Sequence, residues 1–176
     1  ESRVMIDVGV NIASDTDPMP YFTAPEALPM EKMDAVILTH AHLDHAGMLP
    51  VLFRYGYRGP VYCTPPTRDM MLLLQSDYLK VGGAEGKRAP YDMEDIRTCM
   101  RHVIDVDWGQ TVDIAPDMKL TFHNAGHILG SSSVHLHVGD GKHNIVFSGD
   151  QKYEKSWLFD AANTRFPRCE TLVIES

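Results

Sequence analysis

The sequence has no long hydrophobic run and few cysteines, and both absences argue against whole classes of protein. No apolar stretch approaches the ~20 residues that a membrane span needs, and the N-terminus lacks the pattern of a signal peptide. The three cysteines, Cys63, Cys99 and Cys169, stand far apart with no C-x-x-C pair. This spacing argues against a disulfide framework and against a thiolate zinc site. We therefore expect reduced cysteines in a cytoplasmic protein.

An excess of basic residues is also missing. The chain carries 16 Lys and Arg against 24 Asp and Glu, a formal net charge of −8, whereas general nucleic-acid binders usually show a basic face. The acidic balance does not exclude an enzyme that cuts nucleic acid, because bound divalent cations add positive charge where a phosphate must lie. If the substrate is nucleic acid, most of the Lys and Arg residues that contact its backbone phosphates should lie outside this chain.

The patterns that are present are those of one globular domain. The 176 residues are 44% hydrophobic, enough to build a core, and show no internal repeat, heptad pattern or low-complexity tract. Short apolar runs alternate with amphipathic segments, which predicts an α/β or α+β domain built in layers. Both ends fall in strand patterns, so we expect the chain to be part of a longer protein.

The predicted elements follow from apolar runs and from helix and turn signals. Asp92, with acids two and three residues later, marks a helix start, and Asp140-Gly141 marks a hairpin turn. The Met70–Leu74 run is interpreted as core packing on a helical period. Residues 11–31 are expected to be loop, with a short helix near Pro25–Leu28. Helices are expected over 44–55, 64–81 and 92–101, and strands over 4–8, 35–39, 61–63, 111–114, 119–123, 133–138, 144–148 and 171–176, the last of them buried.

The most informative segment is H-x-H-x-D-H at residues 40–45, directly after a predicted strand. A divalent ion such as zinc takes imidazole nitrogen and carboxylate oxygen at ~2.0–2.2 Å. His40 and His42, at i and i+2 of an extended segment, point the same way and can share one ion. Once the chain turns helical, Asp44 and His45 face a neighbouring point. The spacing therefore predicts two adjacent ions, ~3.5–4 Å apart as in two-metal hydrolytic sites.

Three more side chains of the same chemistry follow predicted strands. His127 lies in a glycine-containing loop, Asp150 lies just past a strand, and Asp7 precedes Gly9 after the first strand. Loops at strand ends that converge on one edge of a sheet often form sites, and the Asp150 carboxylate can bridge two ions. Each also has a structural interpretation, since a Gly-His loop can be purely structural and either aspartate can stabilise a turn.

H-x-H-x-D-H, with the later Gly126-His127 and Gly149-Asp150 pairs, resembles the metallo-β-lactamase superfamily. The resemblance implies a four-layer αββα sandwich with a two-metal centre on one edge, here truncated at both ends. It also implies a ligand set. His40, His42 and His127 would hold the first metal, Asp44 and His45 the second, with Asp150 bridging them and Asp7 supporting the ligands from behind.

A narrower resemblance, carried by Ala125–Ser131 and Leu172–Ser176, is to the β-CASP branch of RNA-processing and DNA-repair nucleases. It implies an endonuclease, able also to act as a 5′–3′ exonuclease, that cleaves RNA phosphodiester bonds in mRNA 3′-end processing or transcription termination. The chain would be the metallo-β-lactamase part, residues 1–176, with a β-CASP domain beginning at about residue 176. The full-length protein would act on RNA as a homodimer or in an RNA-processing complex.

The same resemblance assigns catalytic roles. Asp44 would orient the attacking water, Asp150 would join two divalent ions that we expect to be Zn²⁺, and Glu175 would be the first acidic motif of the branch. In this branch the second metal takes one further His and another His protonates the leaving group; both would lie beyond Ser176. We therefore expect the first metal to be held more tightly, and this part alone to be weakly active or inactive.

The remaining polar residues leave competing functions open. Ser131 is expected to make a loop or substrate-phosphate contact, because no partner base for a nucleophile is evident. His135 and His137 are expected on an exposed strand face, and His102 and His143 at the surface. The competing functions are a glyoxalase II-like hydrolase of small esters or thioesters, a non-catalytic scaffold of an RNA complex, and a di-iron redox protein, since imidazole and carboxylate alone do not choose between zinc, manganese and iron.

Overall fold

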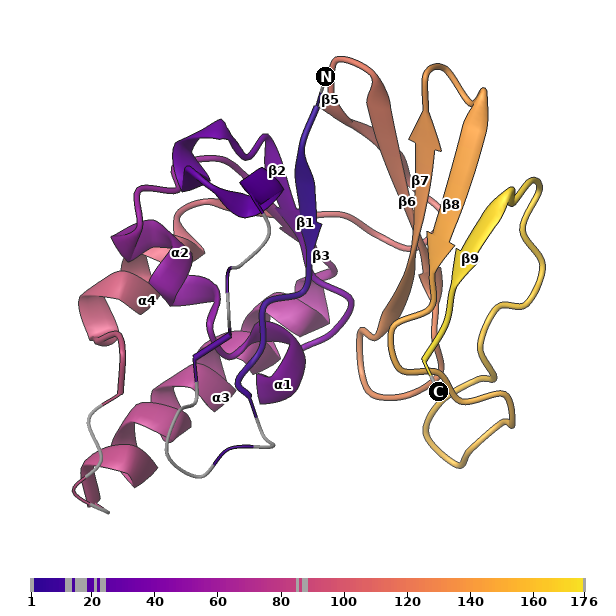
Figure 1. The fold of residues 1–176 in the computed structure, drawn as a ribbon. Helices are drawn as coiled ribbons and strands as arrows, with labels where there is room; N and C mark the ends of the chain where they lie inside the picture. The colour runs from indigo at the N-terminus through magenta and orange to yellow at the C-terminus, as the bar shows by residue number, and fades with distance from the viewer. Residues whose placement is uncertain are drawn as a thin grey trace.

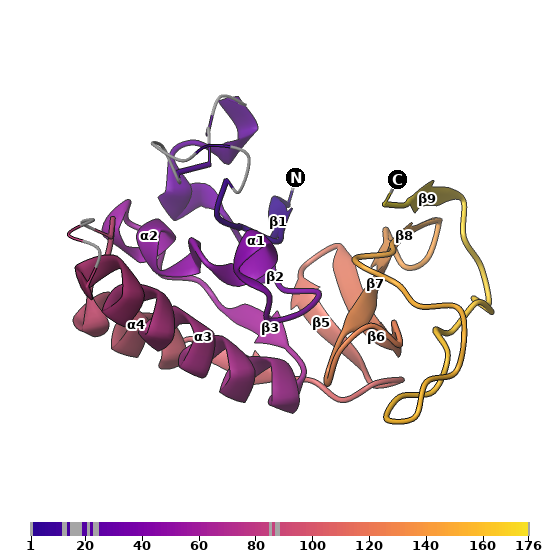
Figure 2. The same cartoon turned by 90° about the horizontal axis from the view of Figure 1, so that it is seen from below.

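The computed structural model describes residues 2–11, 14, 19–20, 22, 25–84, 86 and 89–175. Two sheets pack face to face, and helices cover the outer face of the first (Figures 1 and 2). The predicted two-sheet α/β architecture is confirmed. The elements are β1 (Val4–Ile6), η1 (Pro25–Ala27), η2 (Met30–Lys32), β2 (Ala35–Ile37), α1 (Leu43–Ala46), α2 (Leu49–Arg54), β3 (Val61–Cys63), α3 (Pro65–Ala84), α4 (Met93–Met100), β4 (Val103–Asp105), β5 (Thr111–Ala115), β6 (Met118–Asn124), β7 (Ser132–Val138), β8 (His143–Phe147) and β9 (Thr171–Val173).

The first sheet is parallel, in the order β1-β2-β3-β4, and is apolar on both faces. The second strand, β2, explains the continuous apolar run in this part of the sequence. Ala35 and Ile37 face the second sheet, whereas Val36 and Leu38 join the core beneath the helices. A strand covered on both sides has no polar face to alternate with the apolar one.

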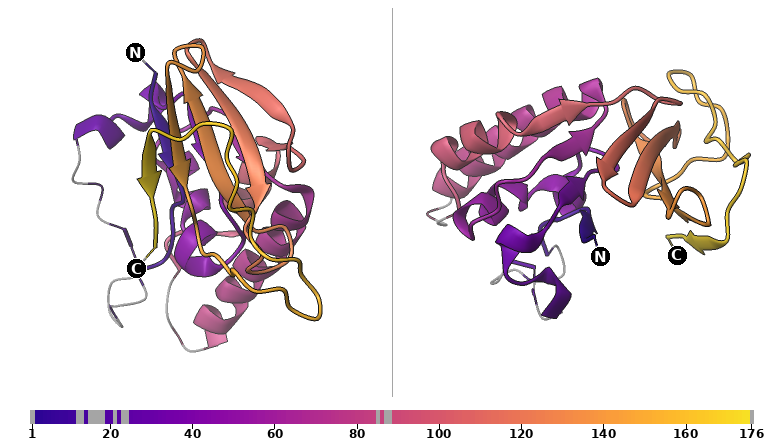
Figure 3. Two further views of the ribbon diagram at one scale, coloured as in Figure 1. Left: turned by 90° about the vertical axis from the view of Figure 1, so that its right-hand side faces the viewer. Right: turned by 90° about the horizontal axis from the view of Figure 1, so that it is seen from above.

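The second sheet, β5-β6-β7-β8-β9, is antiparallel up to β8, and β9 pairs parallel to β8. Cross-strand partners Leu120 and Leu136, and Phe122 and Val134, turn inward and pack against the first sheet. The predicted β7–β8 hairpin is confirmed, with positive φ at Asp140 and Gly141. No helix among the described residues covers the outer face of this sheet; the chain after β8 crosses it instead (Figure 3). The part of the chain that the structure describes therefore forms three of the four expected layers.

The helix expected over residues 44–55 is two helices, α1 and α2, and Pro50 explains the break. Proline has no N–H to donate to the carbonyl four residues earlier and favours the first turn of a new helix, where the structure places it. The carbonyl of Ala46 accepts a hydrogen bond from the Gln75 side-chain amide instead, at 2.8 Å. Gln75 is fully buried in α3, so this bond ties α1 to the long helix.

Several other expectations need correction. The structure adds β4 and η2 to the predicted elements, and α3 extends to Ala84. The last strand is an exposed edge, with Leu172 55% and Val173 46% exposed, because within the described chain its outer edge has no neighbouring strand. The Met70–Leu74 run is core only in part: Met71 is buried, whereas Leu72 and Leu73 face solvent.

Two further sequence predictions hold. The helix expected from Asp92 is confirmed, with that carboxylate accepting from the backbone N–H groups of Glu94 and Asp95 as an N-cap. Among the described helices, none combines the length and apolar character needed to cross a bilayer.

Gly9 allows the chain after β1 to lie against α1. The flanking N–H groups of Val8 and Val10 donate to the carbonyls of His45 and Leu43, and a Cβ on Gly9 would stand 1.6 Å from the Asp44 carbonyl oxygen. We predict that Gly9→Ala lowers the free energy of unfolding by about 1–3 kcal/mol or more, as overpacking does. Urea denaturation measures this.

Gly83 provides the matched control. It lies in α3, where an added Cβ would meet no atom within 4 Å, so Gly83→Ala should leave stability unchanged or raise it by up to about 1 kcal/mol. Equal stabilities for the two variants would contradict the prediction, because they would show that the backbone at Gly9 can move away from the Asp44 carbonyl without a loss of stability.

Candidate metal centre

The fold gathers the predicted site residues at one end of the two sheets. β1 and β2 are parallel, so Asp7 and the segment from Thr39 follow neighbouring strand ends. β6 and β8 flank antiparallel β7 and therefore run the same way, which brings the loops bearing His127 and Asp150 together. The α1 helix lies at this end, the lower one in Figure 1.

Four side chains from three of these segments form the cluster. The Nδ1 atom of His42 is 3.1 Å from Nε2 of His40 and 3.3 Å from Nε2 of His127. An Asp150 carboxylate oxygen, Oδ2, lies 3.4 Å from His127 Nε2 and 3.8 Å from His40 Nε2. All four atoms lie within 4.8 Å of one another. Tetrahedral zinc with bonds of ~2.0–2.1 Å separates its ligand atoms by roughly 3.3 Å. The four distances above, 3.1–3.8 Å, are near that value, so the donor set can hold such an ion.

A second acid–imidazole group adjoins the first. His45 Nε2 lies 3.2 Å from the other Asp150 oxygen, Oδ1, and 3.8 Å from Oδ2 of Asp44. Asp150 thus presents one oxygen to each group. The predicted residues His40, His42, Asp44, His45, His127 and Asp150 all meet here.

Asp7 lies behind the cluster and fixes the orientation of His45. Its carboxylate accepts hydrogen bonds from the Thr39 backbone N–H at 2.8 Å, from the Thr39 hydroxyl at 2.7 Å and from His45 Nδ1 at 2.8 Å. With Nδ1 occupied by Asp7, His45 turns Nε2 toward Asp150. Carboxylates that hold the far nitrogen of a ligand histidine set its tautomer in this way.

Thr39 is a site residue that the sequence reasoning missed. Its hydroxyl donates to the Asp7 carboxylate, so it can only accept at its other contact, from His40 Nδ1 at 3.0 Å. A proton on Nδ1 leaves the lone pair of His40 on Nε2, the atom that faces the cluster. The available signal was a threonine between a buried strand and the first histidine, which alone has too many structural explanations.

The loop that carries His127 is held from two sides. The buried Ser131 hydroxyl accepts from the backbone N–H groups of His127 and Ile128, at 3.1 and 3.2 Å. The Gly130 carbonyl accepts from the hydroxyls of Thr64 and Thr67 at the start of α3. As placed, Ser131 orders the loop from beneath, and the substrate contact predicted for it stays a prediction.

Glu175 lies beside the loop that carries Asp150. Its Oε1 accepts from the Gln151 backbone N–H at 2.6 Å, and its own N–H donates to the Ser148 hydroxyl at 3.2 Å. Glu175 and Asp150, together with Asp7 and His45, line a cavity of about 280 Å³. The carboxylate therefore positions the Asp150 loop.

Electrostatics keep His40 neutral and favour a positive charge on His45. Burial, followed by the imidazoles of His45, His42 and His127, lowers the pKa of His40 from 6.5 to about 2. Neutral His40 keeps the lone pair that a metal ligand needs. Burial also lowers the pKa of His45, but the Asp7 hydrogen bond and the charges of Asp7, Asp150 and Asp44 outweigh it, so the pKa is raised overall.

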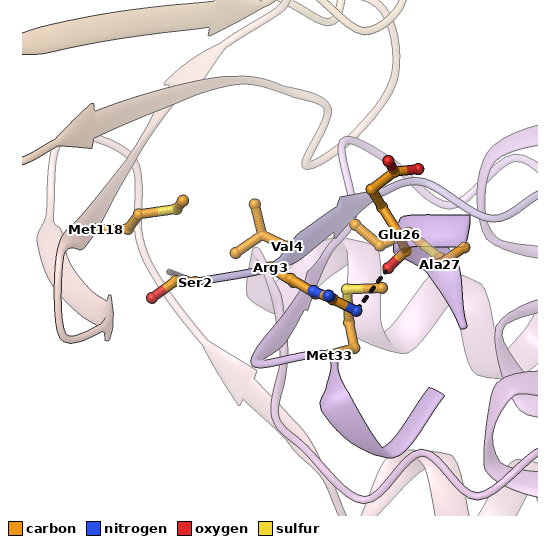
Figure 4. Close-up of a pocket in the computed structure, with 8 residues that line it drawn as sticks. Ser2, Arg3, Val4, Glu26, Ala27, Met33 and Met118 are labelled. Atoms are coloured by element: carbon orange, nitrogen blue, oxygen red, sulfur yellow. Dashed lines mark hydrogen bonds between the residues drawn. The ribbon is translucent and has the colours of Figure 1, made fainter. Parts of the chain in front are cut away.

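Some cavities lie away from this chemistry. One of about 670 Å³ opens at the amino end of β1, where Arg3 donates to the Glu26 carbonyl beside Met33, and Met118 lines the opposite side (Figure 4). Its lining has a single carboxylate and no imidazole, so it offers no set of metal donors.

The histidines on β6 and β7 correct another expectation. His135 is 1% exposed, not on an open strand face, because Phe166 packs across it and across His123. His123 Nε2 lies 3.3 Å from His135 Nδ1, and His137 bonds the Asn144 amide oxygen. Burial, followed by the neighbouring His137 and His123, lowers the pKa of His135 to about 4. His143 is at the surface as expected, whereas His102 is half-buried and bonds the Gly59 carbonyl.

The family profile of the metallo-beta-lactamase superfamily domain matches residues 1–170. The chain belongs to this superfamily, as its motifs predict. Over 176 residues it is 58% identical to transcription termination factor FttA of Methanosarcina mazei and 56% identical to that of Methanocaldococcus jannaschii. All of this chain is covered, but it spans 28% of each of these relatives.

A solved structure shows a weaker likeness. YhfI of Bacillus subtilis, described as a metallo-beta-lactamase fold protein, gives a TM-score of 0.46 at 22% identity, over 73% of this chain and 45% of its own. The family assignment therefore depends on the sequence matches.

Thr39→Val tests the positioning of His40. We predict about 10- to 100-fold weaker Zn²⁺ binding, the range for loss of a partner behind a ligand, because the isosteric valine cannot hold the His40 tautomer. Competition with a chromophoric chelator measures the affinity. Thr98→Val is the control, since that hydroxyl accepts from Arg101 on the open surface of α4, away from the cluster. Equal affinities for the two variants would remove Thr39 from the site.

The buried His135 should make stability depend on pH. Its pKa is lower in the folded than in the unfolded chain, so on acidification only the unfolded chain takes up the proton. We predict that the free energy of unfolding falls from pH 6.5 toward about 4, by at most about 1.4 kcal/mol per pH unit for this group. His135→Leu should remove that share of the slope in chelator-treated protein, whereas His143→Leu should follow the wild type. If the free energy of unfolding had the same pH dependence in the wild type and in both variants, the prediction for His135 would be wrong.

Proposed function

We propose that this protein is a metal-dependent ribonuclease, an endonuclease that hydrolyses RNA phosphodiester bonds in 3′-end processing or transcription termination and can also act as a 5′–3′ exonuclease. The observation that carries the proposal is the cluster of three imidazole nitrogens and one carboxylate oxygen within 4.8 Å of one another, beside a second group that shares Asp150. RNA as the substrate is supported by the name of the relatives, transcription termination factor, because termination acts on a growing transcript.

The proposed centre holds two divalent ions, and Zn²⁺ suits the imidazole-rich donors. His40, His42 and His127, with one oxygen of Asp150, hold the first ion. His45, Asp44 and the other Asp150 oxygen hold the second. This second group has three donors among the described residues against four in the first, so the first ion should be held more tightly.

A bound pair of such ions supplies an activated water near neutral pH and neutralises charge on the phosphate oxygens. The chain positions the reactants around it. The Asp44 carboxylate is 39% exposed, so it reaches the substrate side and can orient the attacking water. Glu175 holds the Asp150 loop, and Asp7 holds His45, so the ligands need little rearrangement when substrate binds.

The remaining parts of the proposal concern the longer protein. A β-CASP domain beginning at about residue 176 would supply a further histidine ligand and the histidine that protonates the leaving group. The support is that the chain spans only 28% of its relatives. A homodimer or an RNA-processing complex in the cytoplasm is the proposed setting.

Replacing a carboxylate of the centre should stop the reaction. In the complete protein, Asp150→Ala and Asp44→Ala should each lower the rate of RNA cleavage by more than about 100-fold, beyond the loss of an outer partner alone. Binding of RNA should remain largely intact. Cleavage of a labelled single-stranded RNA and binding by fluorescence anisotropy measure the two effects.

Asp113→Ala, on an exposed carboxylate of β5 paired with Lys119, is the matched control and should leave the rate unchanged. Wild-type rates in the Asp44 and Asp150 variants would remove both residues from the mechanism. Hydrolysis of a small thioester with no cleavage of RNA would favour the glyoxalase II-like alternative. RNA binding without hydrolysis of either substrate would favour the scaffold.

A further inference from the structure

The chain after Asp150 forms a closed turn that presents a tryptophan. The Ser156 backbone N–H donates to the Phe159 carbonyl at 2.9 Å, and the Phe159 N–H donates to the Ser156 hydroxyl at 2.9 Å. Trp157 and Leu158 form the tip of this turn and are 104% and 84% exposed. A large apolar ring held in water by a turn closed at its base is a feature that a binding partner would stabilise.

The turn is fixed relative to the metal cluster. Its base lies against Gly126, the residue before His127. A Cβ there would stand 2.8 Å from the backbone atoms of Lys152, Asp160 and Ala162. The backbone N–H of Lys152 donates to the Ala125 carbonyl at 2.9 Å. Because the turn leaves Asp150 at one end and packs on the His127 loop, it lies at the same end of the sheets as the centre (Figure 1).

The charge around the turn differs from that of the rest of the chain. Residues 151–168 contain four basic and two acidic residues, and Arg168 pairs with Glu170 just beyond them, so the segment is close to neutral in a chain of net −8. Lys152 and Lys155 are exposed on either side of Tyr153, itself 56% exposed. Lys155 pairs with Asp160 at 3.0 Å on the open surface, a contact that contributes little and can be exchanged for a phosphate.

Resting on the proposed function, we propose that the Ser156–Phe159 turn is a stacking platform for single-stranded RNA. A base of the strand lies on the Trp157 ring, while Lys152 and Lys155 face the backbone phosphates beside it. Aromatic rings with cationic neighbours bind single strands with little regard to sequence, since every base has a flat face. Positioned beside the cluster, the platform would hold the strand next to the phosphate to be cleaved.

The test measures RNA binding by the complete protein in the presence of chelator, so that no strand is cut. Trp157→Ala should weaken binding of a labelled oligouridylate by about 5- to 100-fold, the effect of losing one stacked base. Trp157→Phe should retain most of the affinity. Lys152→Ala should reduce the slope of log affinity against log salt by roughly 0.7. Leu73→Ala, on the 68% exposed α3 leucine, is the matched control and should bind as the wild type does.

The outcomes separate this inference from the proposed function. Unchanged RNA affinity in Trp157→Ala, in a protein that still binds and cleaves RNA with metal restored, overturns the platform and leaves the ribonuclease. If Trp157→Ala binds RNA normally but changes its oligomeric state in light scattering, the turn makes a protein contact. That result would also overturn the RNA platform. A wild type that neither binds nor cleaves RNA removes the proposed function itself. Because Trp157 is fully exposed, the variants should keep the wild-type melting temperature, which circular dichroism checks.

Discussion

The rest of the site depends on the hydrogen bonds that the Asp7 carboxylate accepts. This carboxylate lies at the end of β1 and bonds the backbone and hydroxyl of Thr39 at the end of β2, as well as His45 in α1. One side chain thereby joins two parallel strands and a helix and fixes which nitrogen His45 turns toward Asp150. Through Thr39 it also fixes the tautomer of His40. The carboxylate is shared among three donors, so its burial leaves no lone charge without a partner.

Sheet packing supplies the second constraint. The three histidines of the cluster do not come from one segment: His40 and His42 follow β2 of the first sheet, whereas His127 follows β6 of the second. Their distance therefore depends on how the inner faces interlock through residues such as Ile37 and Phe122. A core substitution there would move the donor atoms apart without touching a ligand, since close-packed interiors transmit displacement.

Asp150 and the segment after it connect this centre to the outer surface of the second sheet. The loop passes from Asp150 to Gly126 and the exposed turn, and then crosses the sheet, where Phe166 covers His123 and His135. It takes the place that a helical layer would occupy. The same segment therefore begins at Asp150 of the cluster, covers part of the sheet and carries the most exposed aromatic side chain among those described.

The sequence by itself determined the local features. H-x-H-x-D-H, the strand ends at residues 7, 127 and 150, the Asp92 cap and the Asp140-Gly141 hairpin all depend on covalent spacing and on periodicity, which a linear pattern contains. Pro50 also indicates the break between α1 and α2, although the sequence prediction places one helix over 44–55. The tertiary structure alone decided the role of Thr39, the burial of His135 and the exposure of β9. Each of these depends on which distant segment covers a residue, and that choice follows from the packing of whole faces, not from any property of the neighbouring sequence.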